Sequence, residues 1–233
     1  MNRKCIIIAA PSEGKDFLPG TLVDLKNYKN HLKSIKGGAW YEDEIISINT
    51  QGMSDDEINK TITYRLNQLR EADYAMFAFT GHGCMLNNKT TLYLSNSLIA
   101  TDSCIELYLP SKASMLFDCC REIQSITEAR LEKFSATFDH REISVSEARR
   151  IFEDKIGKAN KGHVKLYGCK ENECCNEDSI LGGFYSSSLL QAGRACSIRV
   201  AHNIATIEVQ RRTNRRQNPQ DRSDKTDFPF ILY

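Results

Sequence analysis

The chain has 233 residues, of which 41% are hydrophobic and 26% charged, and its net charge is +1. These values are ordinary for a globular protein and give no bulk field that would favour nucleic acid or a membrane surface. No apolar run reaches membrane-spanning length, since CIIIAA (5–10) is too short. The nine cysteines are odd in number and follow no clear secretion signal. We therefore expect reduced thiols in a cytoplasmic protein, without structural zinc.

The first half of the chain alternates apolar strands with amphipathic helices. We expect strands at 4–10, 44–50, 72–80 and 113–119. Helices are expected at 21–35 and 54–70, with a hairpin arm at 87–95 and a short helix at 102–109. The 54–70 helix opens with a serine cap, and its Ile58, Ile62 and Leu66 share one face.

The second half is less regular. It predicts a strand at 164–169, a helix at 184–192, a helix within 205–215 and a closing strand in DFPFILY (227–233). Residues 121–144 are polar, and we expect a mobile loop with a helical turn or two. The basic stretch 211–225 has no interleaved aromatics, so we expect a solvated loop there. Overall the pattern indicates one α/β domain over 1–233 with a mainly parallel sheet.

Two apolar runs end in chemically reactive residues. MFAFTGHGC (76–84) ends at His82 between two glycines, and MLFDCCREI (115–123) ends at Cys119 and Cys120. The carboxyl ends of parallel strands meet at one edge of a sheet. A cysteine nucleophile needs a nearby base and donors for the developing oxyanion. His82 provides the base, and the N–H groups of Gly83 and of the reactive cysteine provide the donors.

Other chemistries fit these two runs less well. Ser125 and Ile126 stand where a phosphatase loop needs an arginine, GHGCML lacks the third glycine of a dinucleotide-binding turn, and G-x-S-x-G is absent. A vicinal-thiol site that binds metal or senses redox state remains open. A disulfide between adjacent residues would, however, be strained.

The two runs resemble the motifs of the caspase and metacaspase clan of cysteine peptidases. FTGHG (79–83) is similar to the histidine motif, and FDCCRE (117–122) is similar to the nucleophile motif, with Cys120 as the nucleophile and His82 as its partner. Glu122 departs from the caspase pattern, which keeps glycine there. Supporting similarities lie in LPGTLVDLKNYKNHL (18–32), GGFYSSSLLQA (182–192) and FPFI (228–231).

The resemblance implies a caspase-like fold with a mainly parallel six-stranded sheet flanked by helices. It implies a large-subunit-like part at 1–120, a linker at about 121–144 and a small-subunit-like part at about 145–233. It also implies a cysteine endopeptidase in which Gly83 and Cys120 bind the oxyanion. In metacaspases an aspartate at the position of Asp118 pairs with one at the position of Asp24 to bind Arg or Lys. We therefore expect cleavage after basic residues, with one pocket wall near Tyr167-Gly168-Cys169.

Several further expectations come from the same resemblance. Self-cleavage is expected within 121–150, which contains Arg121, Arg130, Lys133, Arg141, Arg149 and Arg150. We expect no cofactor. Calcium activation, which is common in metacaspases, stays an open option, although the sequence shows no readable ligand cluster. The expected partner is a protein or peptide substrate, such as a pore-forming or other effector protein in cell death or defence. The alternative is a catalytically idle caspase-like fold that serves as a protein-binding module.

Overall fold

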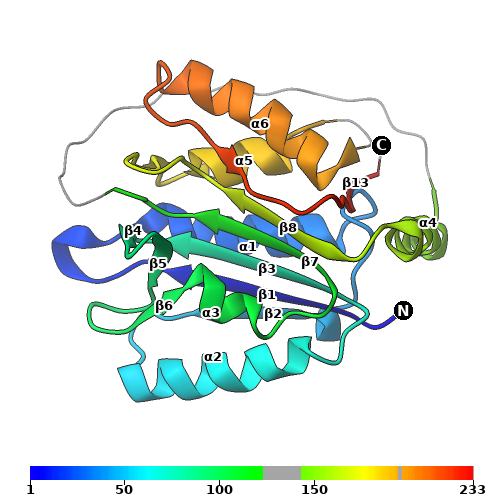
Figure 1. Cartoon of the computed structure of the whole chain (residues 1–233), viewed down its shortest axis with the longest axis horizontal. Helices are drawn as coiled ribbons and strands as arrows, with labels where there is room; N and C mark the ends of the chain where they lie inside the picture. The colour runs from blue at the N-terminus through cyan, green and yellow to red at the C-terminus, as the bar shows by residue number, and fades with distance from the viewer. Residues whose placement is uncertain (123–142, 194–195, 233) are drawn as a thin grey trace.

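The fold centres on a six-stranded sheet. The computed structural model describes residues 1–122, 143–193 and 196–232 (Figure 1). The strands of the sheet are β1 (Arg3–Ala10), β2 (Ile45–Asn49), β3 (Tyr74–Gly81), β7 (Lys112–Asp118), β8 (Gly162–Tyr167) and β12 (Gln220–Asp221). They lie in the order β12-β8-β7-β3-β1-β2, and all pairs are parallel except β12 with β8. The expected α/β class and mainly parallel six-stranded sheet are confirmed.

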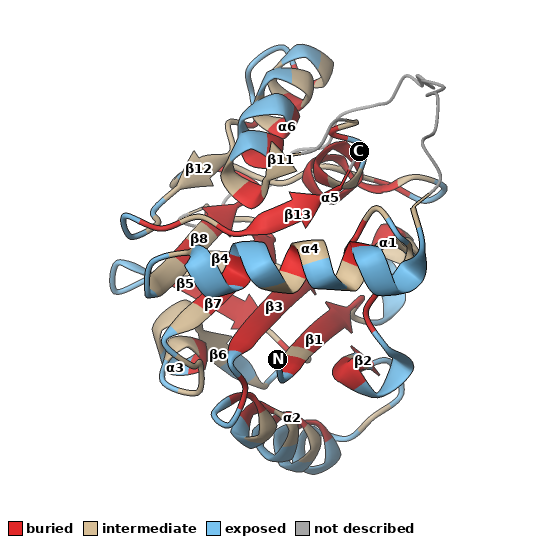
Figure 2. Cartoon of the chain, turned by 90° about the vertical axis from the view of Figure 1, so that its right-hand side faces the viewer, coloured by how far each residue is buried: buried red, intermediate tan, exposed pale blue. Residues whose placement is uncertain are grey.

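Helices cover both faces of this sheet (Figure 1). The first face carries α1 (Pro19–Lys33), α4 (Val145–Lys158), α5 (Phe184–Leu190) and α6 (Ile198–Arg212), and the second carries α2 (Asp55–Leu69) and α3 (Asp102–Glu106). Successive side chains of a strand point to opposite faces. In β1, Cys5 and Ile7 accordingly pack toward α1, whereas Ile6 and Ile8 pack toward α2. The central strands β1, β3 and β7 are therefore buried on both faces, whereas the edge strands β2 and β12 are partly exposed (Figure 2).

Three small sheets lie outside the central one. The strands β4 (Gly83–Leu86), β5 (Lys89–Tyr93) and β6 (Ile99–Thr101) form an antiparallel arm directly after β3. The pair β9 (Glu177–Asp178) and β10 (Gly182–Gly183) precedes α5, and β11 (Cys196–Ser197) pairs with β13 (Pro229–Ile231). Two short 3₁₀ helices complete the description, at Gly14–Asp16 and Glu42–Glu44.

Several expected elements differ from the observed ones. The prediction omits α4, although Ala148, Phe152 and Ile156 recur at four-residue spacing behind the Ser144 cap. Helix α6 begins at Ile198, seven residues before the expected start at 205. Residues 123–142 of the predicted mobile loop lie outside the described residues.

The far edge of the sheet also differs from the expectation. The sixth strand is β12, which lies in the 211–225 stretch expected to be a solvated loop and pairs with β8. Gln217 in that stretch is fully buried and donates to the Gly168 carbonyl oxygen. The closing segment does form a strand, but β13 pairs with β11 outside the central sheet. The basic, turn-rich stretch 211–225 is held in place because polar side chains such as that of Gln217 bond to the backbone at the end of β8.

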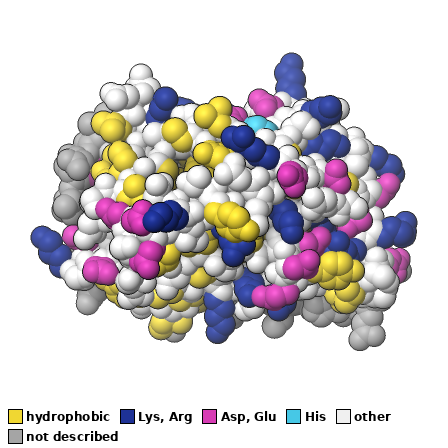
Figure 3. All heavy atoms as spheres, turned by 90° about the horizontal axis from the view of Figure 1, so that it is seen from below, with side chains coloured by type: hydrophobic (Ala, Val, Ile, Leu, Met, Phe, Trp, Pro, Cys, Tyr) yellow, Lys and Arg dark blue, Asp and Glu magenta, His cyan; other side chains and the backbone are white. Residues whose placement is uncertain are grey.

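The surface agrees with the small net charge. On the face that Figure 3 shows from below, basic and acidic side chains are interspersed. Within the described ranges, no helix combines the length and the apolar character that a membrane crossing requires.

Candidate active site

The pairing of β3 with β7 brings the two reactive segments together. Thr80 is paired with Asp118, so His82 and Cys120 each follow that pair by two residues. Gly83 lies against the other segment, because a Cβ atom built on it would stand 2.9 Å from the Cys120 carbonyl oxygen and 2.8 Å from the Cys119 sulfur. Since real side chains do not approach that closely, Gly83 allows the two strand ends to touch.

The imidazole of His82 is oriented by the backbone. Its Nε2 lies 2.6 Å from the carbonyl oxygen of Asp16, in the 3₁₀ helix Gly14–Asp16. A carbonyl oxygen only accepts hydrogen bonds, so Nε2 carries the proton and Nδ1 keeps its lone pair. In the neutral ring, this arrangement leaves the lone pair on Nδ1, which can take a proton.

The two adjacent thiols have different environments. Cys119 is 1% exposed, and burial raises the pKa of its thiol well above the ordinary value. Cys120 is half-buried, and its sulfur lies 3.8 Å from the Cys175 carbonyl oxygen. Because a nucleophile has to reach substrate, Cys120 is the thiol with the suitable position.

Arg121 anchors the segment that carries Cys120. Its side chain is fully buried and stacks 4.1 Å above the Tyr167 ring. The guanidinium donates to the Thr90 hydroxyl at 3.0 Å, to the Cys169 carbonyl at 3.1 Å and to the Gln220 side chain at 2.6 Å. These bonds connect the end of β7 to β5, to the segment after β8 and to β12. Arg121 therefore holds the turn in place and does not face substrate.

Two buried carboxylates lie beside this turn. Asp24 is fully buried on the inner stripe of α1, where it accepts bonds from the Thr80 hydroxyl at 2.8 Å and from the Gly183 N–H at 3.0 Å. Asp118, at the end of β7, is 6% exposed and accepts a bond from the Ser186 N–H at 2.9 Å. Thus β3, β7 and the start of α5 all contribute to one acidic site.

Glycines make room for these carboxylates. A Cβ atom on Gly183 would collide with the Asp118 carboxylate and stand 3.0 Å from an Asp24 oxygen. One on Gly182 would collide with Asp24, and one on Gly168 would stand 2.7 Å from Asp118. Both carboxylates therefore pack against bare backbone. Gly168 belongs to the segment that we expected to form a pocket wall.

A third carboxyl group, from Glu177 in β9, was not predicted. A Cβ atom on Gly20 would stand 2.7 Å from its Oε2, and Gly20 lies one helical turn before Asp24 on α1. The backbone N–H groups of Gly20 and Thr21 donate to Glu177. The sequence carried no signal for it, because one glutamate among the polar residues 171–178 looks like any surface acid.

Burial disfavours the charged form of all three carboxyl groups. It raises the pKa of Asp24 well above the ordinary range, and the charge of Asp118 raises it further. Burial also raises the pKa of Asp118. For Glu177, burial and then the charges of Asp118 and Asp178 raise the pKa to about 7. A cation placed between these carboxyl groups would favour their charged forms.

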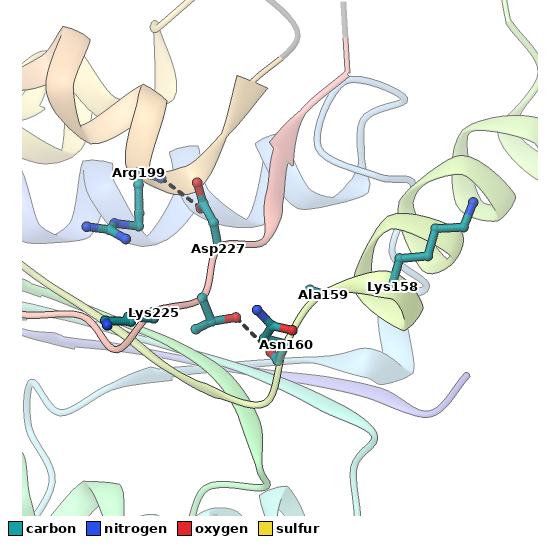
Figure 4. Close-up of a pocket in the computed structure, with 7 residues that line it drawn as sticks. Lys158, Ala159, Asn160, Arg199, Lys225 and Asp227 are labelled. Carbon is teal, nitrogen blue, oxygen red and sulfur yellow. Dashed lines mark hydrogen bonds between the residues drawn. The ribbon is translucent and has the colours of Figure 1, made fainter.

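A separate surface pocket of about 360 Å³ lies at the opposite end of the sheet (Figure 4). Its lining includes Asn160, just before β8, together with Arg199 and Asp227. The Asp227 carboxylate accepts the Arg199 N–H at 3.2 Å. Since His82 and Cys120 follow the carboxyl ends of their strands, this pocket is distinct from the candidate active site.

The comparisons with known proteins agree with this architecture. The family model described as "Caspase domain" matches residues 2–231. The crystal structure of caspase-1 from Spodoptera frugiperda is similar in fold, with a TM-score of 0.57 and 15% sequence identity over 94% of this chain and 85% of that chain. No curated protein matches the sequence. The chain therefore belongs to the caspase-domain family of cysteine peptidases.

Proposed function

We propose that the protein is an endopeptidase that cleaves after Arg or Lys, with Cys120 as nucleophile and His82 as base. One observation supports the specificity above all. The buried carboxylates of Asp24 and Asp118 converge on Gly183, and Asp118 lies two residues before the nucleophile. A guanidinium or ammonium group would pair with both, whereas an acidic side chain would be repelled.

The proposed reaction uses the geometry of the strand ends. Nδ1 of His82 takes the proton of Cys120, and the thiolate attacks the substrate carbonyl carbon. The N–H groups of Gly83 and Cys120 donate to the oxyanion. His82 then protonates the leaving amine, and water hydrolyses the thioester. The Asp16 carbonyl supports this role because it fixes the tautomer in which Nδ1 accepts a proton.

The test is the initial cleavage rate on matched fluorogenic peptides that end in Arg, Lys, Asp or Leu. We expect turnover after Arg and Lys, and its loss in Cys120→Ala. Turnover after Asp or Leu alone would overturn the proposed pocket but keep the peptidase. If the folded wild type cleaves none of the four peptides, with or without calcium, the result would favour the alternative of a catalytically idle fold that binds proteins.

Self-processing is proposed for the linker between the large-subunit-like and small-subunit-like parts. Residues 123–142 of that linker lie outside the described residues. Of the flanking arginines, Arg121 is buried and Arg149 is paired with Glu44. We therefore expect self-cleavage at peptide bonds between Arg121 and Arg149. Intact masses of the wild type and of Cys120→Ala test the idea, since identical full-length masses would contradict it.

The remaining biological role follows from the family resemblance. We propose a protein substrate, such as a pore-forming or other effector protein, in cell death or defence within the cytoplasm. Incubation of the wild type and Cys120→Ala with candidate effectors, read by fragment mass, tests this role. Cleavage at a basic residue by the wild type alone is the expected result.

A further inference from the structure

Thiol groups gather around the nucleophile more densely than a Cys-His pair requires. Besides Cys119 and Cys120, three cysteines of the segment after β8 lie here. The thiols of Cys169 and Cys175 both donate to the Cys119 carbonyl oxygen, at 3.4 and 3.2 Å. Cys174 lies between two contacts with the segment of the nucleophile. The Glu173 carbonyl oxygen accepts the Arg121 N–H at 2.9 Å, and the Cys120 sulfur lies 3.8 Å from the Cys175 carbonyl oxygen. The proposed reaction gives Cys174 no role.

Cys174 lies between the nucleophile and an acid. Its thiol interacts with the side chain of Cys120 and with the carboxylate of Glu122. These two contacts, together with burial, raise the pKa of Cys174. The Cys174 thiol therefore keeps its proton while Cys120 is a thiolate, and it loses its proton more easily once Cys120 has become a neutral sulfenic acid. Both Cys120 and Cys174 are half-buried, so a small oxidant reaches them.

The other thiols are less suitable partners for Cys120. Cys119 is its chain neighbour, and an eight-membered ring between adjacent residues is strained. Cys169 is fully buried, and Cys175 contacts the Asp118 carboxylate and the Cys119 carbonyl oxygen. Cys174 is separated from Cys120 by a long stretch of chain, and the contacts of residues 120–121 with Glu173 and Cys175 bring it beside the nucleophile. That arrangement is the one that thiol–disulfide chemistry requires.

We propose that Cys174 is a resolving cysteine, which converts peroxide-oxidised Cys120 into a reversible disulfide. The proposal rests on the proposed role of Cys120 as the reactive nucleophile. Hydrogen peroxide first oxidises the Cys120 thiolate to a sulfenic acid and leaves as hydroxide. The sulfur of Cys174 then attacks the sulfenic sulfur. The S–S bond forms, and the sulfenic hydroxyl leaves as water with the proton of Cys174. In total, two thiols are oxidised and one peroxide is reduced to two waters.

The disulfide has two consequences for the enzyme. It removes the nucleophile, so peptidase activity stops while the bond persists. It also protects Cys120 from further oxidation to sulfinic and sulfonic acids, which thiol reductants do not reverse. Dithiothreitol should therefore restore an enzyme that has Cys174 and leave one without it inactive.

The test compares the wild type with Cys174→Ser, and with Cys104→Ser as a matched control on the exposed surface of α3. Each protein is treated with graded hydrogen peroxide and then with dithiothreitol, and its melting temperature is recorded beforehand. We expect the wild type and Cys104→Ser to lose activity and regain most of it. The activity that Cys174→Ser regains after dithiothreitol should be at least roughly tenfold lower than that of the wild type. Equal recovery in all three proteins would overturn the proposal.

Mass spectrometry reads the same modification without any peptidase assay. In the oxidised wild type, fragmentation of the joined peptides should locate the bond between Cys120 and Cys174, with a loss of two hydrogens. In Cys174→Ser, Cys120 should instead gain oxygen atoms. Oxygen addition on Cys120 in the wild type, with no cross-link, would refute the resolving role even if the peptidase is active. A cross-link in a protein that cleaves no peptide would refute only the proposed function.

Discussion

Asp24→Asn is the sharpest test of the acidic site, because it should weaken catalysis and strengthen the fold at the same time. Asp24 is fully buried and nearly isosteric with asparagine. A hydrogen bond to a charged partner is worth about 1.5–3 kcal/mol. Loss of one such bond to a P1 arginine should lower kcat/KM by roughly 10- to 150-fold. Catalytic groups remain unchanged, since Asp24 contacts Thr80 and Gly183 and not His82 or Cys120.

The assay pairs two peptides that end in arginine and in citrulline, its neutral isostere. The variant should lose rate on arginine and keep its rate on citrulline, so the ratio between them should fall. Asp56→Asn, on the exposed surface of α2, is the control and should leave the ratio unchanged. Equal losses on both peptides would mean that Asp24 supports the fold of the site and does not recognise charge.

Stability should change in the opposite direction. The folded-state pKa of Asp24 is raised above its unfolded value, mainly by burial. The stability of the wild type is therefore greatest below the unfolded pKa and falls as pH rises toward the folded pKa. The variant has no titrating group there, so its melting temperature should exceed that of the wild type by a margin that grows with pH. A margin that shrinks with pH would refute the assigned cause.

Two further predictions concern Glu177 and Gly183. With an arginine peptide, kcat/KM should rise with pH through about 7 as Glu177 ionises. Glu177→Gln should remove that rise. Identical pH profiles of kcat/KM in the wild type and the variant would exclude Glu177 from the pocket. Gly183→Ala should lower the free energy of unfolding, measured with urea, by about 1–3 kcal/mol, because the added Cβ meets the carboxylates of Asp24 and Asp118. The control is Gly157→Ala, whose Cβ meets nothing within 4 Å and should not lower it.

Long apolar strands made the centre of the fold predictable. The runs around β1, β3 and β7 are fully buried, so their composition alone marks them. The far edge could not be predicted in the same way. Strand β12 has only the two residues Gln220 and Asp221, and it is held by backbone pairing with β8. Helix α4 could have been predicted, because the sequence shows both its Ser144 cap and the spacing of its apolar residues.

The candidate site was predictable where single residues sit at strand ends. His82, Cys120 and Asp118 follow directly from the ends of β3 and β7. Asp24 needed the family resemblance, since an acid on a helix is most often a surface residue. Glu177 and Cys174 lie in a polar loop whose path only the tertiary structure fixes. Their proximity to the site comes from the way that loop folds back over β7, which no local pattern encodes.

The Asp16 carbonyl that orients His82 belongs to the main chain, so every residue type at position 16 supplies the same acceptor. No point substitution there deletes the group as a side-chain exchange would. The orientation of the His82 imidazole depends on the path of the 11–18 loop, in which Ser12 and Gly14 adopt left-handed conformations. If His82 is the proposed base, a lineage that loses activity through the partner of this histidine would do so by lengthening or shortening that loop. Insertions and deletions are therefore the genetic changes to inspect in decayed relatives that keep both His82 and Cys120.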